Sequence, residues 1–145
     1  MGTHLETIEA RMNAAQASLR PYLGDLLARL AQTYIIPFGL AFLVSTVGGV
    51  VFANALPALP QSTLSVLLFA VNVLIFWYGW RWLERRTRAT SLYILYVRAA
   101  RERRALASAL AHAQDGNAQA QNDLALLARA YEDAVAQFKA GISEA

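Results

Sequence analysis

The sequence predicts an all-α membrane protein: a two-span transmembrane helical hairpin with amphipathic cytoplasmic helices that form a bundle or coiled coil. Hydrophobic residues make up 57% of the 145 positions and charged residues 16%, against roughly 45–50% and about 25% in soluble domains. The uncharged residues are concentrated, because no charged residue lies between Arg29 and Arg81. About 20 apolar residues cross a bilayer, so this segment is long enough for two crossings and a turn.

The turn between the two spans is predicted at "ALPALPQST", Ala55 to Thr63, which contains two prolines. Ser62 or Thr63 is expected to cap the following helix. We place the spans at residues 34–56 and 63–83, both helical because a backbone in lipid must satisfy its own hydrogen bonds. The alternative is a buried hairpin of a soluble protein, but uncharged spans of this length exceed what so short a chain can cover.

The stretch "FWYGWRWLERRTR", from Phe76 to Arg88, has the pattern of a membrane exit. Aromatic rings collect at the headgroup level and arginines stay on the cytoplasmic side, where they contact anionic headgroups. The predicted interface residues are Trp77, Tyr78, Trp80, Trp82, Arg81, Arg85, Arg86 and Arg88. We therefore expect an integral protein of the bacterial inner membrane with both termini in the cytoplasm, or in the matrix if the membrane is mitochondrial.

The amino-terminal segment, residues 1–33, is predicted to be an amphipathic cytoplasmic helix. Its apolar residues alternate at spacings of three and four, as in a coiled coil; they are Leu5, Ile8, Met12, Ala15 and Leu19. Pro21 is expected to kink or restart this helix, and Pro37 is expected in the first turn of the first span. An alternative is that the segment lies on the lipid surface.

Residues 84–145 are predicted to form an arginine-rich helix and a terminal helix. The first is expected to continue from the second span through the arginines. "LYILYV", Leu92 to Val97, also suits a short strand, but helix is favoured because the chain offers no partner strand. A turn is expected at residues 115–117, with Gly116 at positive φ and Asn117 as the cap, and Gly141 is the expected end of the last helix.

Small and polar residues recur inside the predicted spans. The first span has Ala41, Ser45, Gly49 and Ala53 at every fourth position, and the second has Ser65, Asn72 and Gly79 at every seventh. Small residues allow helix backbones to approach closely in lipid. We therefore predict helix packing at Ala41, Gly49, Ala53 and Gly79.

Asn72 is the most informative polar residue, because an unpartnered amide in hydrocarbon is costly. It is expected to bond Ser45 or Thr46 within the hairpin, to line a polar constriction in an oligomeric pore, or to join neighbouring copies. Ser45, Thr46 and Asn72 are thus the candidate pore lining or interhelical polar contact.

A second group of arginines follows further along the chain: Arg98, Arg101, Arg103 and Arg104. They are expected either to pair with acidic residues across the bundle or to form a positive vestibule that favours anions. A basic isoelectric point near 9.6 would also allow nucleic acid. We do not expect that partner, because the first arginine group is explained by lipid contact.

No catalytic set is found in the sequence. His4 and His112 are isolated, cysteine is absent, and there is no glycine-rich phosphate loop. We expect a non-enzyme without a cofactor or metal.

The order of a cytoplasmic helix, spans at 34–56 and 63–83, and an arginine-rich helix resembles the SLATT domains, two-span effectors of prokaryotic conflict systems. The resemblance covers most of the chain, is one of arrangement, and implies a membrane pore. The mitochondrial calcium uniporter family has a similar arrangement, but "PQSTLS", Pro60 to Ser65, lacks the acidic filter residue of that family.

The leading functional hypothesis is a homo-oligomeric ion-conducting or membrane-permeabilising pore. An alternative is an accessory subunit that anchors a larger membrane complex by binding a protein partner through its cytoplasmic helices. A third is a hairpin that shapes membrane curvature.

Overall fold

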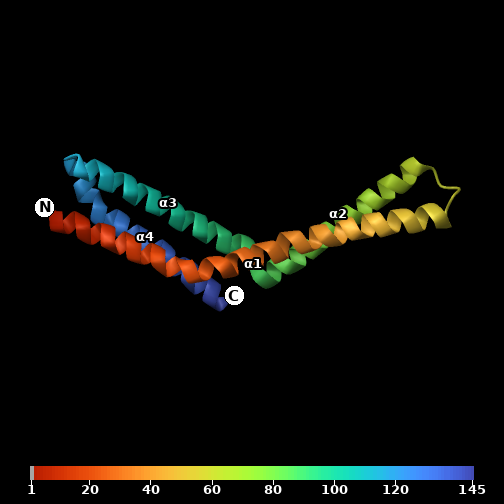
Figure 1. Cartoon of the computed structure of the whole chain (residues 1–145), viewed down its shortest axis with the longest axis horizontal. Coiled ribbons are helices and arrows are strands. Elements are labelled where there is room, and N and C mark those ends of the chain that lie inside the picture. Colours follow the sequence, from red (N-terminus) through yellow and green to blue (C-terminus); the bar gives the residue numbers. More distant parts are fainter. Residues whose placement is uncertain (1) are drawn as a thin grey trace. The chain divides into compact units, whose positions relative to one another are not determined.

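The computed structural model describes residues 2–145, and every regular element among them is an α-helix. In chain order the helices are α1 (Gly2–Ala55), α2 (Gln61–Thr87), α3 (Ala89–Gln114) and α4 (Ala118–Glu144), as Figure 1 shows. The all-α class is confirmed, and Leu92 to Val97 is helical within α3. The chain divides into a helical bundle, built by residues 2–27 with Thr90–Ala145, and a helical hairpin, Ala28–Ala89.

The helical bundle buries one apolar stripe from each of its three helices. The first part of α1 contributes Ile8 and Leu19, and α3 contributes Leu92 and Leu106. The buried residues of α4 are Leu124, Ala128, Tyr131, Ala134, Val135, Phe138 and Ile142. Each large apolar side chain buried in this way stabilises the fold by about 1.5–3 kcal/mol. The predicted amphipathic stripes therefore cover one another within one copy of the chain.

The turn between α3 and α4 is present where the sequence predicts it. Gly116 has a φ of +90°, and the Asn117 side-chain oxygen accepts hydrogen bonds from the backbone of Gln119 and Ala120. The prediction that Gly141 ends the last helix is wrong, because α4 continues to Glu144. A Cβ at position 141 would lie 3.2 Å from methyl carbons of Leu92 and Leu95, so Gly141 allows α3 and α4 to pack closely.

The sequence predicts that Pro21 kinks or restarts the helix, and the restart does not occur. α1 is helical through both Pro21 and Pro37, so Pro37 lies in a helix interior rather than a first turn. A proline leaves the carbonyl four residues earlier without its helical donor. Ala17, whose carbonyl loses its donor at Pro21, is exposed. The ring of Pro37 is buried, and its packing contacts compensate for the lost hydrogen bond.

The hairpin turn lies between Ala55 and Gln61. The predicted cap is wrong: α2 begins at Gln61, after Pro60, with no side-chain cap. The carbonyl oxygen of Pro60 accepts from the backbone of Leu64 at 3.2 Å, so Ser62 and Thr63 already lie inside the first turn. Proline at this place suits a helix start because its φ is already near the helical value.

The second helix does not continue unbroken through the arginines. Helix α2 ends at Thr87, and Arg88 adopts left-handed backbone angles, with φ of 50° and ψ of 29°. Its backbone N–H still donates to the Glu84 carbonyl at 2.8 Å. A new helix, α3, begins at Ala89.

The hairpin exposes its apolar side chains. Helix α2 buries none of its residues, and Phe42 and Phe69 are 68% and 70% exposed. Both α1 and α2 contain a stretch that is long and apolar enough to cross a membrane.

Candidate functional site

The two helices of the hairpin meet along a seam that contains the predicted polar contact. Asn72 Nδ2 donates to Ser45 Oγ. The Asn72 Oδ1 atom is buried without a hydrogen-bond partner. Whichever way the amide is turned, one of its polar ends bonds Ser45 and the other is unsatisfied. Thr46 is not part of this contact, because its hydroxyl donates to the Phe42 carbonyl of its own helix at 2.9 Å.

The small residues of α1 line the same seam. Ala41 and Ser45 border a shallow groove beside Asn72. Gly49 and Ala53 border a second groove with Leu68, and a Cβ at Gly49 would lie 3.7 Å from Leu68. The predicted packing face of α1 therefore does contact α2.

Gly79 of α2 packs against Pro37 of α1. A Cβ at position 79 would lie 3.4 Å from Pro37 Cβ and 3.9 Å from its Cα. The absence of a side chain at Gly79 allows the proline ring to be buried here. Sequence reasoning identified Gly79 as a packing residue but missed its partner.

The carboxyl end of α2 is bound to α1 by residues that sequence reasoning missed. The hydroxyls of Thr33 and Thr87 lie 2.7 Å apart. Thr87 donates its hydroxyl hydrogen to the Leu83 carbonyl, so Thr33 is the donor between the two. Arg29 Nη1 also donates to the Thr87 carbonyl at 3.2 Å. A positive charge near the carboxyl end of a helix is stabilising because it interacts favourably with the helix dipole. A signal was available: the four-residue repeat of Ala41 to Ala53 extends backward through Pro37, Thr33 and Arg29.

The predicted interface residues gather on the last turns of α2. The rings of Trp77 and Trp80 have centroids 5.7 Å apart, and the Arg86 guanidinium lies 5.3 Å from the Trp82 ring. The Trp80 Nε1 atom is buried without a partner. Tyr78 and the remaining arginines, Arg81, Arg85 and Arg88, are exposed.

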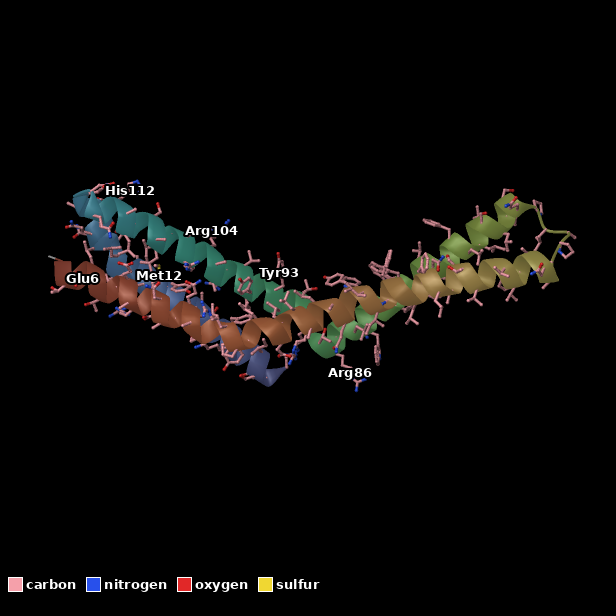
Figure 2. All side chains as sticks on the ribbon, viewed as in Figure 1. Glu6, Met12, Arg86, Tyr93, Arg104 and His112 are labelled. Carbon is pink, nitrogen blue, oxygen red and sulfur yellow. The ribbon has the colours of Figure 1, made fainter. Side chains whose placement is uncertain are left out.

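The second arginine group is not brought together as a single ring or patch. Arg98 donates to Gln137 of α4 at 3.3 Å, and Arg101 is exposed. Arg103 and Arg104 border a cavity inside the bundle. Figure 2 shows the Arg104 side chain extending outward from α3.

The bundle's bidentate ion pair comes from a different arginine. Arg11 of α1 donates through Nε and Nη2 to the two carboxylate oxygens of Glu132 on α4, at 2.9 and 2.7 Å. The hydrogen bond to Arg11 lowers the pKa of Glu132. The same contact raises the pKa of Arg11.

The described residues 2–145 contain no group of three or more histidine, aspartate or glutamate side chains placed to hold a metal ion. His112 Nδ1 lies 2.7 Å from the Ser108 carbonyl of its own helix. The polar seam of the hairpin thus remains the candidate functional site.

Comparisons with known proteins add no relative, since no family model, no curated protein and no solved structure matches the chain.

Proposed function

We propose that the protein is a non-catalytic integral membrane protein whose two-span hairpins assemble into an ion-conducting or membrane-permeabilising pore. The unpartnered amide oxygen of Asn72, on an otherwise apolar and exposed hairpin, is the observation that carries this proposal. A SLATT-like arrangement implies the same function.

Membrane insertion is supported by the exposed surface of the hairpin. Water would contact many large apolar side chains there, far more than the few hundred Å² of contiguous apolar patch that soluble monomers tolerate. The uncharged segment between Arg29 and Arg81 supplies both crossings without placing an ionised group in hydrocarbon.

The proposed orientation places both termini in the cytoplasm of a bacterial inner membrane. Both ends of the chain belong to the helical bundle. This agrees with two crossings, because an even number of crossings returns the chain to the side from which it started. The arginines near the end of α2 would contact anionic headgroups on that side, because basic residues are retained in the cytoplasm.

The pore itself is supported by the chemistry at Asn72. An unsatisfied amide oxygen in hydrocarbon costs several kcal/mol. Asn72 borders a groove formed with Phe38, Ala41, Phe42 and Ser45. Rotation of the whole side chain about its Cα–Cβ bond, with loss of the Ser45 contact, would bring the amide to water or to a polar group of another copy. A ring of such amides around an axis would form a polar constriction.

The proposal predicts that the polarity of Asn72 controls ion flux. Purified protein in liposomes should release a trapped ion indicator, and Asn72→Leu should reduce the rate about tenfold or more, because it replaces the polar constriction with an apolar one. Asn54→Leu is the matched control, because it makes the same change at an exposed asparagine near the end of α1, outside both grooves of the seam. This variant should conduct as the wild type does.

The mass of the protein's oligomer in detergent is to be measured on the same preparation as the ion flux. A defined ring supports the pore, while a monomer, or a complete lack of flux from folded wild-type protein, would exclude it.

The alternative function, an anchoring subunit, is favoured by an exposed apolar group on α3. Tyr93 and Ile94 lie four and three residues before Val97 on the helix, and the three side chains are 47%, 61% and 45% exposed. Such a patch on the cytoplasmic bundle would suit a partner helix. Co-purification of a partner at a fixed ratio, together with an absence of flux, would favour this alternative over the pore.

A further inference from the structure

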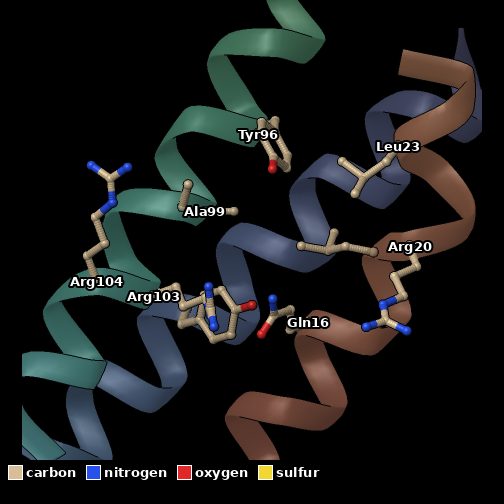
Figure 3. Close-up of a pocket in the computed structure, with 10 residues that line it drawn as sticks. Gln16, Arg20, Leu23, Tyr96, Ala99, Arg103 and Arg104 are labelled. Carbon is tan, nitrogen blue, oxygen red and sulfur yellow. The ribbon is translucent and has the colours of Figure 1, made fainter. Parts of the chain in front are cut away.

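The helical bundle contains a cavity of about 300 Å³ where its three helices meet. Gln16, Leu19, Arg20 and Leu23 line it from α1, and Tyr96, Ala99, Ala100, Arg103 and Arg104 from α3; Tyr131 of α4 completes it. Figure 3 shows the Arg103 guanidinium extending from α3 to the neighbourhood of the Gln16 amide of α1. Small-molecule sites in proteins begin at about this volume.

Two residues that line this cavity each contain a hydrogen-bond donor without a partner among residues 2–145. Arg103 Nε and the Tyr131 hydroxyl oxygen are both buried and unbonded, and Tyr131 as a whole is only 1% exposed. Buried polar groups without partners are rare because each costs the free energy of its lost hydration. Because both residues line the same cavity, it is the place in the bundle where a ligand could supply the missing acceptors.

The charged residues that line the cavity favour a ligand with a negative charge. Its lining includes three arginines and, among the described residues, no carboxylate. The bidentate carboxylate of Glu132 bonds Arg11 instead. Burial raises the pKa of Tyr131 more than the neighbouring Arg103 lowers it, so this hydroxyl keeps its hydrogen at neutral pH and serves as a donor.

We propose that this cavity binds a phosphate-bearing anion. Arg103, Arg20, Tyr131 and the Gln16 amide present more donors than one carboxylate can accept, and guanidinium groups match phosphate oxygens bidentately. Arg104, which points outward in Figure 3, adds charge at the rim. Leu19 and Leu23 offer apolar contacts for the organic part of the ligand. This proposal rests on contacts within the bundle alone, so it holds whether or not the hairpin conducts ions.

The phosphate has two chemical sources, a soluble organophosphate or a lipid headgroup. Glycerol 3-phosphate is the soluble probe, and phosphatidic acid added to the detergent micelle is the lipid probe, with phosphatidylcholine as its reference. Calorimetric titration of the full-length protein at constant ionic strength measures the affinity for each of the two probes. Binding of glycerol 3-phosphate supports a soluble ligand, and binding of phosphatidic acid alone supports a lipid headgroup.

Arg103→Gln should weaken binding of the effective probe about tenfold or more, because it removes a charge-assisted contact from inside the cavity. Tyr131→Phe should weaken it several-fold without lowering the melting temperature of the free protein, since its hydroxyl has no partner to lose. Arg101→Gln is the matched control: it makes the same charge change on the same helix at a position outside the cavity. It should alter affinity less than about twofold.

Failure of both probes to bind the wild-type protein would overturn the proposal. So would equal weakening by Arg103→Gln and Arg101→Gln, which would indicate unspecific attraction to a basic surface. Circular dichroism of each variant separates lost binding from lost folding, and Tyr131→Phe keeps the test valid if Arg103→Gln fails to fold.

Discussion

The contact between Arg11 and Glu132 illustrates how a single pair of residues joins distant parts of the chain. Its two hydrogen bonds connect α1 to α4 in the helical bundle. The pair lies at the surface, with the two side chains 44% and 38% exposed. Solvent therefore screens most of its electrostatic attraction.

The lowered pKa of Glu132 gives this pair a defined pH dependence. A carboxyl whose pKa is lower in the folded state stabilises the fold above its unfolded pKa, and this contribution is lost as pH falls through the folded pKa. The ordinary value is 4.5, so the contribution is complete at neutral pH and disappears in acid below that value.

We therefore predict that Glu132→Gln lowers the melting temperature at neutral pH by only ~1–2 °C. The difference from wild type should vanish in acid, as measured by circular dichroism of the protein in detergent. Asp133→Asn, an exposed neighbour outside the pair, is the control and should show no such pH-dependent difference. A Glu132→Gln effect that persists unchanged in acid would contradict the assignment.

The elements of the hairpin are held by a repeat on α1. Every fourth residue from Arg29 to Ala53 faces α2 in the contacts described above. A four-residue step exceeds the helical period of about 3.6 residues, so this row winds slowly around α1. It can contact α2 along its length because the two helices cross at an angle and follow the inclined row. Where the residues on the facing sides of both helices are small, as at Pro37 and Gly79, the two backbones approach closely.

This packing predicts a position-specific effect of glycine substitution. Gly79→Leu should force α1 and α2 apart and destabilise the hairpin by about 1–3 kcal/mol, because an added side chain there overlaps the Pro37 ring. Gly39→Leu is the matched control, since a Cβ at position 39 meets no atom within 4 Å. Thermal unfolding in detergent, followed by tryptophan fluorescence, measures both variants. Equal destabilisation by the two substitutions would refute the contact.

At the scale of the whole molecule, the proposed membrane orientation is testable because the chain has no cysteine. Single substitutions Thr3→Cys, Ala58→Cys and Ser143→Cys introduce unique sites near both ends and in the hairpin turn. In right-side-out vesicles, a membrane-impermeant maleimide should label Ala58→Cys and leave the other two unlabelled; inverted vesicles should give the opposite result.

Labelling of Thr3→Cys and Ser143→Cys from opposite sides would contradict two crossings. Labelling of all three sites equally from one side, without detergent, would contradict insertion itself.

Much of this protein follows from local sequence. Apolar periodicity predicts the amphipathic helices, and Gly116 and Asn117 predict the turn before α4. The depth of Asn72 predicts Ser45 or Thr46 as its partner within the hairpin, and the structure selects Ser45. These succeed because helix periodicity, positive φ and the cost of an unpaired amide act over a few residues or leave few possible partners.

Tertiary contacts decided the rest. The sequence shows four arginines from Arg98 to Arg104 as one group, but only Arg103 and Arg104 border the cavity, because α1 and α4 supply its other walls. Pro37 lies inside a helix because Gly79 leaves room for its ring, and Gly141 does not end α4 because Leu92 and Leu95 pack against it. Such outcomes depend on which side chains meet across helices, and chain-local rules contain no information about that.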